Sequence, residues 1–273
     1  MYYNHKIVNI YQCRGNAMAT IISLALQKGG SAKTTTAVNL SAELQAKGKR
    51  VLLIDMDSQA NSSFSSGINT SDLDNSLYNV LTSNSRYSCR AREAILHTDF
   101  FDILPADLDV ADLAAEIDSP IALKKAITSI QGSYDVIILD CPPSLNILTV
   151  NAFVCSDWII IPTQPQPFFI TGLMDLEKTI TDVRKNWNPK LKVMGILLTK
   201  YNDRTKLSKK LTETIDALSS RLNTSVFETT IRESIVVPES QLAQAPLRIY
   251  SPKSKPSVDY ETFALEVINR MKE

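Results

Sequence analysis

The sequence has little glycine, cysteine or histidine. Its 273 residues include 8 glycines, 4 cysteines and 2 histidines, whereas about 7% glycine is usual in proteins. Cys13, Cys89, Cys141 and Cys155 form no CxxC pair, and the chain is too long to depend on a disulfide framework. A zinc site built from Cys and His is therefore excluded. Against so few glycines, any glycine pair stands out.

Long apolar runs are also missing. No stretch approaches the ~20 apolar residues that a membrane-spanning helix needs, and the first 17 residues lack the layout of a signal peptide. We therefore expect a cytoplasmic protein with reduced thiols and no membrane association. Because the first buried strand begins just after Met18, we expect residues 1–17 to be a disordered leader or the product of a mis-called start codon.

The chain has no overall excess of charge. Its 29 Lys and Arg balance 29 Asp and Glu, which excludes a uniformly basic nucleic-acid coat. The distribution is uneven, however. Residues 1–183 carry 13 basic and 19 acidic side chains, a net −6, whereas residues 184–273 carry 16 basic and 10 acidic, a net +6. This basic third is either a solvated helix face with a basic tail or a surface that binds a polyanion.

Short apolar segments alternate with longer helical patterns along the chain. Continuous apolar strands separated by helices are typical of a parallel sheet that is buried on both faces. The pattern predicts a single α/β domain over residues 18–273, with a doubly wound, mainly parallel sheet flanked by helices. The predicted strands are 21–26, 51–54, 101–104, 136–139, 158–161 and 193–198, and the predicted helices are 34–48, 107–131 with a break near Pro120, 146–155, 170–186, 205–222 and 257–272.

The segment QKGGSAKTTT at residues 27–36 joins the first predicted strand to the helix that follows it. A Gly-Gly pair lets the backbone turn tightly and point its N–H groups inward at a helix N-terminus, which makes an anion site. A plain turn would not explain two lysines flanking the glycines. The predicted phosphate-binding residues are Lys28, Gly29, Gly30, Ser31, Ala32, Lys33, Thr34 and Thr35, with Thr34 where P-loop proteins ligate Mg²⁺.

Carboxylates follow two of the predicted strands. Asp55 and Asp57 end the segment VLLIDMD, and Asp140 ends VIILD. The carboxyl ends of parallel strands meet at the edge of the sheet where α/β proteins bind ligands. A carboxylate there holds Mg²⁺ or orients an attacking water. A lone Asp at a strand end is often a helix cap, but three beside a phosphate loop indicate a metal and hydrolysis site.

Taken in order, these segments resemble the ParA branch of the ParA/MinD ATPases, whose phosphate loop is a deviant Walker A motif. The resemblance extends from about Met18 to the C-terminus. It implies the P-loop NTPase fold, the cofactors ATP and Mg²⁺, and slow, partner-stimulated ATP hydrolysis in a nucleotide-sandwich homodimer. The matching segments are QKGGSAKTTTAVNLS, VLLIDMDSQAN, YDVIILDCPPSLNILTVNA, LLTKYNDRT and, more loosely, residues 231–259.

The resemblance also implies a role for each candidate residue. Lys28 would cross to the ATP of the partner subunit, Lys33 would act in its own site, and Asp57 would position the hydrolytic water, which makes these three the predicted catalytic residues. The predicted metal residues are Thr34, Asp55 and Asp140. Segments 57–67 and 140–148 would be switches that respond to the γ-phosphate. Residues 199–202 and 238–246 lie where the family holds adenine.

The sequence departs from the family at both glycine positions of these loops. Ala32 replaces a Gly before the second lysine and Ala60 replaces a Gly before Asn61, while Ser31 and Ser58 replace a common Val and a Pro. A methyl group at a tight phosphate turn restricts φ. These substitutions leave open a lower affinity for ATP or a lower rate of hydrolysis. They also leave open that the protein is a binding module that uses ATP only to dimerise.

By the same resemblance, the ATP-bound dimer would bind double-stranded DNA without sequence preference and associate with the nucleoid. A ParB-like adaptor would trigger hydrolysis, and the cargo would be a plasmid, a chromosome or a protein organelle. The basic third supplies the phosphate neutralisation that DNA binding needs. The candidate DNA-binding residues are Arg204 and Arg232, placed by resemblance, and Lys206, Lys209, Lys210, Lys253 and Lys255, chosen for their charge.

Two relatives of other function are weighed as alternatives. A MinD-like membrane ATPase would dock through a basic amphipathic C-terminal helix, but the apolar stripe from Tyr260 to Met271 is flanked by acidic residues and suits anionic lipid poorly. We therefore expect this stripe in the core. An iron–sulfur relative would need Cys141 and Cys155 as cluster ligands, yet neither lies in a Cys-Gly-Gly context, and we expect both to be small buried hydrophobes.

Overall fold

The computed structural model describes residues 18–201 and 206–272, with the backbone alone over 206–209. The leader expected at residues 1–17 lies outside this range. The elements in chain order are β1 (Thr20–Leu24), α1 (Lys33–Ala46), β2 (Val51–Asp55), α2 (Asn61–Ser65), α3 (Leu77–Leu81), α4 (Ala91–Ala94), β3 (Leu96–His97), β4 (Asp102–Leu104), η1 (Leu108–Ala111), α5 (Leu113–Glu116), α6 (Ala122–Ile127), η2 (Gln131–Ser133), β5 (Val136–Asp140), α7 (Ile147–Cys155), β6 (Trp158–Thr163), α8 (Pro167–Asn186), β7 (Lys192–Leu198), α9 (Lys206–Ser219), η3 (Ser220–Leu222), α10 (Val236–Leu242), α11 (Leu247–Tyr250) and α12 (Lys255–Arg270).

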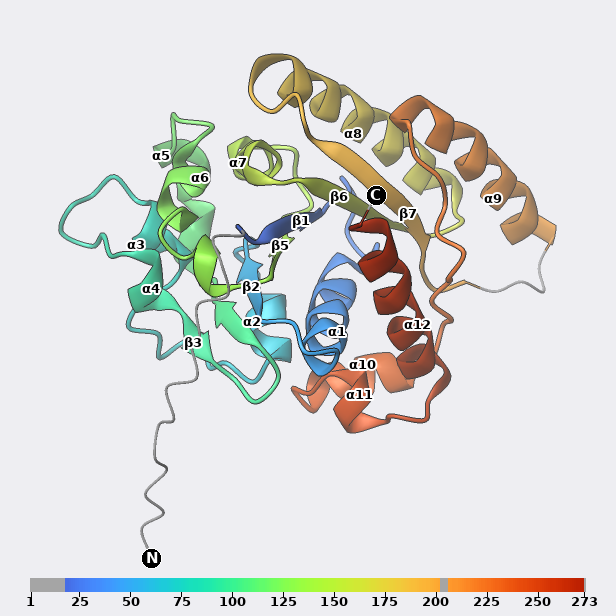
Figure 1. The fold of residues 1–273 in the computed structure, drawn as a ribbon, viewed down its shortest axis with the longest axis horizontal. Helices are drawn as coiled ribbons and strands as arrows, with labels where there is room; N and C mark the ends of the chain where they lie inside the picture. The colour runs from blue at the N-terminus through green and yellow to red at the C-terminus, as the bar shows by residue number, and fades with distance from the viewer. Residues whose placement is uncertain (1–17, 202–205, 273) are drawn as a thin grey trace, which may run out of the picture.

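A seven-stranded sheet runs through the middle of the molecule in the order β3-β4-β2-β5-β1-β6-β7 (Figure 1). The pairs are parallel except for β3 with β4 at one edge. The central strands β1, β2 and β5 are the apolar segments that the sequence predicts, and they are buried on both faces. In register, Asp55 at the end of β2 pairs with Asp140 at the end of β5. The two carboxylates therefore lie side by side at the carboxyl edge of the sheet.

Two apolar layers cover the two faces of the sheet. One contains residues of α6, α7, α8 and α9, and the other contains residues of α1, α11 and α12. Helix α1 follows β1 directly and packs against α12 from the C-terminal end of the chain, as Figure 1 shows. It ends at Ala46, and Gly48 two residues further on has a φ of 80°, the left-handed conformation usual after a helix C-terminus. The mainly parallel sheet flanked by helices confirms the predicted fold class.

The apolar stripe of α12 belongs to the core, as expected. Tyr260, Phe263, Ala264 and Val267 are buried, and the Phe263 ring meets Phe227 edge to face with 4.9 Å between ring centroids. This stripe is therefore used to hold α12 against the sheet. Within the described residues, no helix is both long and apolar enough to span a membrane.

The helix expected over residues 107–131, with a break near Pro120, is divided further than predicted. The structure has η1, α5, α6 and η2 there, and the backbone on both sides of Pro120 is bonded to the side chain of Asn151 in α7. Asn151 Oδ1 accepts a hydrogen bond from Leu123 N, while its Nδ2 donates to Ser119 O. The short elements α2, α3, α4, β3, α10 and α11 were not predicted, because two to seven residues are too few to show a periodicity.

Gly195 provides a test of the packing between β7 and α12. An added Cβ would overlap the ring of Phe227 and come within 2.7 Å of Arg270 Nη1. We expect Gly195→Ala to lower the free energy of unfolding by about 1–3 kcal/mol, measured by urea denaturation. Gly132→Ala is the matched control, because a Cβ there meets nothing within 4 Å. Equal midpoints for Gly195→Ala and the wild type would show that this packing is loose.

Candidate functional site

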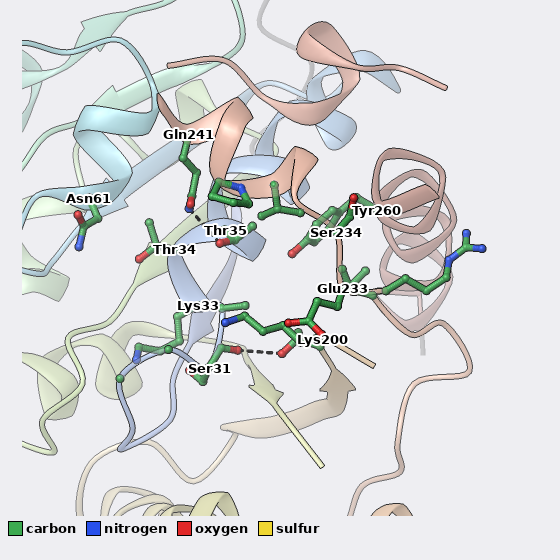
Figure 2. Close-up of a pocket in the computed structure, with 18 of the residues that line it drawn as sticks. Ser31, Lys33, Thr34, Thr35, Asn61, Lys200, Glu233, Ser234, Gln241 and Tyr260 are labelled. Carbon is green, nitrogen blue, oxygen red and sulfur yellow. Dashed lines mark hydrogen bonds between the residues drawn. The ribbon is translucent and has the colours of Figure 1, made fainter. Parts of the chain in front are cut away.

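A cavity of about 780 Å³ opens at the carboxyl edge of the sheet (Figure 2). Its volume lies within the range of small-molecule sites. One wall is the turn between β1 and α1, and the other is formed by residues 231–235 and 237–238 together with Gln241 and Tyr260. The residues of the predicted phosphate loop that line it are Gly29, Gly30, Ser31, Ala32, Lys33, Thr34 and Thr35.

The carbonyl groups of this turn are held by side chains from other strands. Gln164, just after β6, donates from Nε2 to the Gly30 carbonyl at 2.5 Å, and Thr199, just after β7, donates from Oγ1 to the Ser31 carbonyl at 3.1 Å (Figure 2). Sequence reasoning did not assign these two roles. They fix the backbone between the strand and the helix, because each carbonyl has a partner outside the turn.

The N–H groups of the same turn remain without partners. Within the described part of the chain, no acceptor meets the backbone N–H groups of residues 29–35, and the first bond of α1 runs from Thr36 N to Ala32 O at 2.9 Å. The first turn of α1 contains no acidic residue and no side chain caps it. A 14-residue helix with an uncapped N-terminus carries a partial positive charge. The turn is therefore built to bind an anion.

The Lys33 ammonium group adds a full positive charge beneath the turn. It is 7% exposed and donates to the carbonyls of Leu26 and Lys28, each at 3.2 Å. Burial lowers its pKa, while the negative charges of Asp140 and Asp57 oppose that shift. A buried cation whose contacts are mostly neutral carbonyls is stabilised by a bound anion. The predicted role of Lys33 at the outer phosphates has this electrostatic support.

Asp140 connects the phosphate loop to the segment after β2. Its Oδ2 atom accepts hydrogen bonds from Thr34 Oγ1 at 2.8 Å and from Ser62 Oγ at 2.7 Å. Its Oδ1 atom is buried and meets no donor among the described residues. A buried carboxylate oxygen without a partner marks a place for a cation or water. Asp140 thus fits the metal role that the resemblance implies.

Asp55 differs from Asp140 in that its hydrogen bonds go to the segment that follows β2. It is fully buried and accepts from Asp57 N at 3.2 Å, from Ser63 N at 2.9 Å and from Ser63 Oγ at 2.8 Å. These bonds hold the start of the 57–67 segment against the end of β2. Asp57 itself lines the cavity, where the resemblance expects it. Burial together with the Asp140 charge raises the pKa of Asp55 to about 7, and burial raises that of Asp140 to about 6.

The oxygen ligands at this site suit Mg²⁺ only if a phosphate supplies further ligands. No cluster of three or more His, Cys, Asp or Glu side chains that could hold a metal occurs within residues 18–201 and 206–272. The Thr34 hydroxyl and the unpartnered Asp140 oxygen lie together, and Mg²⁺ ordinarily combines one or two such groups with phosphate oxygens and waters. The residues therefore fit a magnesium–phosphate complex.

The wall opposite the loop was only partly predicted. Of the stretches expected to hold adenine, Thr199, Lys200, Pro238 and Gln241 line the cavity, whereas residue 202 lies outside the described residues. Gln241 Nε2 also donates to Thr35 Oγ1 at 3.1 Å (Figure 2). Residues 231–235, Val237 and Tyr260 complete the wall and were missed, because no local pattern in the sequence places them near the loop.

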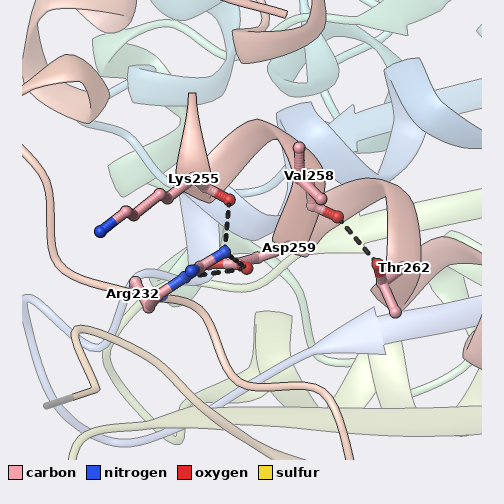
Figure 3. Close-up of polar contacts among 5 residues, drawn as sticks. All are labelled: Arg232, Lys255, Val258, Asp259 and Thr262. Carbon is pink, nitrogen blue, oxygen red and sulfur yellow. Dashed lines mark hydrogen bonds and ion pairs between the residues drawn. The ribbon is translucent and has the colours of Figure 1, made fainter. Parts of the chain in front are cut away.

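Arg232 on this wall is bound to Asp259 of α12 (Figure 3). Its Nε donates to Asp259 Oδ2 at 2.9 Å and its backbone N to the same atom at 3.0 Å, while its Nη2 also donates to the Lys255 carbonyl at 3.3 Å. This pair fastens the 226–232 segment, which runs beside β7, to the start of α12. The Arg232 side chain, 45% exposed, has its charge largely compensated by Asp259, and its predicted contact with DNA stays a prediction.

The other basic candidates lie in separate parts of the chain. Arg204 and the side chains of Lys206 and Lys209 lie outside the described residues. Lys210 is exposed on α9, Lys253 is exposed in the turn before α12, and Lys255 is exposed at the first residue of α12. Because α9 and α12 belong to opposite layers, the described lysines are not gathered on one helix face.

Cys141 and Cys155 are buried, 1% and 8% exposed, as expected for small hydrophobes. Burial raises the pKa of Cys141 to about 12 and that of Cys155 further still. Both thiols are therefore neutral near pH 7, as expected for cysteines that pack as small buried hydrophobes.

A Gly-Gly anion turn between β1 and α1, faced by the acidic ends of β2 and β5, defines a P-loop NTPase. Residues 19–193 match the family described as an AAA domain. The chain is 36% identical over 258 residues to the chromosome partitioning protein ParA of Caulobacter vibrioides, covering 92% of this chain and 94% of that one. It therefore belongs to the ParA branch of this family of ATPases.

Solved structures share the whole fold. The cobyrinic acid a,c-diamide synthase of Mycobacterium smegmatis, with bound ADP and magnesium, superposes with a TM-score of 0.80 at 31% identity, covering 94% of this chain and 96% of that one. The septum site-determining protein MinD of Pyrococcus horikoshii, complexed with Mg-ADP, gives a TM-score of 0.74 at 29% identity, covering 92% and 96%. Nucleotide with magnesium is thus a ligand of neighbours that share this fold.

Both alanines that replace family glycines have left-handed backbones. Ala32 has φ 70° and Ala60 has φ 50°, a conformation that costs a side-chain-bearing residue about 1–2 kcal/mol. We expect Ala32→Gly and Ala60→Gly each to raise the free energy of unfolding by up to about 1 kcal/mol, measured by denaturant unfolding. The control, Ala46→Gly in the exposed last turn of α1, should lower it by about 0.5–1 kcal/mol. Destabilisation by either loop glycine would contradict this account.

The raised pKa of Asp55, about 7, sets a pH dependence. An unfolded Asp titrates near pH 4, so between about pH 4 and 7 the folded state binds more protons than the unfolded state. The free energy of unfolding of the nucleotide-free protein should therefore fall as pH rises through this window. In Asp55→Asn the fall should be shallower, as measured by urea unfolding at pH 5 and pH 8 without Mg²⁺. An identical decrease in the free energy of unfolding of the two proteins would show that Asp55 does not cause the pH dependence.

Proposed function

We propose that this chain is a Mg²⁺-dependent ATPase whose ATP-bound homodimer binds DNA without sequence preference. A ParB-like adaptor would stimulate hydrolysis and couple the cycle to the positioning of a cargo near the nucleoid. The observation that carries the proposal is the turn at residues 29–35, whose N–H groups have no partners among the described residues and which sits over the buried Lys33 ammonium. The 36% identity to a ParA protein over 92% of the chain supports the biological role.

The site supports each chemical step with its own residues. The turn and Lys33 would bind the β- and γ-phosphates, and Thr34 with Asp140 would hold Mg²⁺, which when bound neutralises phosphate charge. Asp57, at the cavity wall, would hold the attacking water in line with the γ-phosphate. Its Oδ1 accepts from Gln59 N at 3.1 Å, which limits the directions in which the carboxylate turns.

Dimerisation is supported by where Lys28 lies. Its side chain is exposed, and it is absent from the described lining of the cavity, although Gly29 beside it is part of that lining. A lysine at the edge of a phosphate site and outside its own cavity is free to reach the phosphates of a second copy. Dimerisation would also double the +6 charge of the C-terminal third, which links the nucleotide to DNA affinity.

The fold alone does not select this function, because its structural neighbours include proteins named for cobyrinic acid amidation and for septum placement. The MinD-like alternative requires a lipid-binding C-terminal helix. Here the apolar stripe of α12 is buried in the core, where Tyr260 and Phe263 are 1% and 0% exposed, so it is not available to bind lipid. We therefore favour DNA over membrane as the surface that the ATP form binds.

The test is binding to an arbitrary-sequence duplex with ATP–Mg²⁺ and with ADP–Mg²⁺ across a salt series. We expect binding with ATP only, with affinity falling steeply as salt rises, at a slope of about −0.9 per phosphate neutralised. Asp57→Ala, which removes the residue that positions water, should keep the protein on DNA in ATP and lower turnover by at least ~10²-fold. The readouts are fluorescence anisotropy and phosphate release.

Absence of DNA binding in both nucleotide states, from protein shown to bind ATP, would overturn the DNA proposal. The same preparation would then be tested on anionic vesicles. Unaltered phosphate release from Asp57→Ala would remove Asp57 from the catalytic site.

A further inference from the structure

The Lys28 side chain lies against the first turn of α8. Its Nζ atom is 5.6 Å from the centroid of the Phe168 ring, within the range of a cation–π contact. Both residues face solvent, and Phe168 is 73% exposed. The lysine of the phosphate loop therefore has a defined neighbour outside its own cavity, and this neighbour is an aromatic ring.

The start of α8 is attached to the phosphate loop at two further points. Gln164 donates to the Gly30 carbonyl and accepts in turn from Gln166 Nε2 at 2.9 Å. Gly172, one turn into α8, packs so closely that an added Cβ would lie 3.3 Å from the Gln27 carbonyl oxygen. Residues on both sides of Phe168 thus contact the loop on both sides of Lys28. The backbone that carries the ring is therefore attached to the backbone that carries the lysine.

Phe168 has no packing role that explains it. The apolar stripe that attaches α8 to the core consists of Phe169, Leu173, Leu176, Ile180 and Val183, all buried. Phe168 is not part of this buried stripe and is 73% exposed. A phenylalanine exposed to this degree is unfavourable in water, and burial of the ring would recover free energy.

We propose that Phe168 and Lys28 form a self-association contact with a second copy of this chain. The Phe168 ring orients Lys28 toward the nucleotide held by the second copy, and that copy covers the ring. Phe168 is thus a positioning residue for Lys28. In a two-fold dimer the contact occurs twice. The proposal rests on the nucleotide-dependent dimer proposed above and adds the surface that aligns it.

The test compares the full chain with Phe168→Ala, Phe168→Tyr, Lys28→Gln and the double variant Phe168→Ala/Lys28→Gln. The dimer dissociation constant is measured by sedimentation velocity in ATPγS–Mg²⁺, and the affinity of the monomer for ADP by calorimetry. Met174→Ala is the matched control, an apolar side chain on α8 that is 48% exposed and lies a full turn or more from Phe168.

We expect Phe168→Ala to raise the dimer dissociation constant about 10-fold, because the contact is lost at two places, while the ADP affinity stays within twofold. Phe168→Tyr, which keeps the ring, should dimerise like the wild type, and Met174→Ala should do the same. Lys28→Gln and the double variant should both stay monomeric in ATPγS, because both lack the ammonium group that reaches the nucleotide of the second copy.

A dimer constant unchanged in Phe168→Ala, with dimerisation lost in Lys28→Gln, would overturn the role of Phe168 and leave the dimer standing. Wild-type dimerisation by Lys28→Gln would overturn the cross-site role of Lys28 and this proposal with it. A wild-type chain that stays monomeric in ATPγS would overturn the dimer itself.

Discussion

The anion turn between β1 and α1 is the constraint on which the rest of the site depends. Its carbonyl groups are held by Lys33 from α1, by Gln164 after β6 and by Thr199 after β7. Its N–H groups are left without partners in the described structure. Unpaired N–H groups at a helix N-terminus form a site for phosphate oxygens. Three strands and one helix must be correctly placed to create it.

The second organising feature is the pair of carboxylates at the ends of β2 and β5. Parallel register places Asp55 beside Asp140. Burial raises the pKa of both carboxyls, and the Asp140 charge raises that of Asp55 further. Each carboxylate is hydrogen-bonded to a serine of α2, Asp140 to Ser62 and Asp55 to Ser63. Helix α2 is therefore attached to the atoms that a cation would contact. A change in charge at this edge of the sheet would act directly on the hydrogen bonds that hold α2.

The cavity is closed by chain that lies far away in sequence. The 226–232 segment runs beside β7 and is fastened to α12 through Arg232 and Asp259, and α10 reaches the phosphate loop through Gln241 and Thr35. Helix α12 is fixed in turn by Phe263 in the core and by Arg270, whose guanidinium lies 4.0 Å from the centroid of the Phe227 ring. The contacts that stabilise the C-terminal layer therefore also fix the shape of the cavity.

The sequence alone determined the sheet strands, the phosphate loop and the strand-end carboxylates. Apolar runs report burial on both faces of a sheet, and a Gly-Gly turn between two lysines has few other uses. Only the tertiary structure decided the opposite wall of the cavity, the engagement of Arg232 by Asp259, and the attachment of α8 to the loop. It also showed that Ala32 and Ala60 stand in the left-handed region. These features depend on contacts between residues tens to hundreds of positions apart, and such contacts leave no periodicity or local propensity in the chain from which they could be predicted.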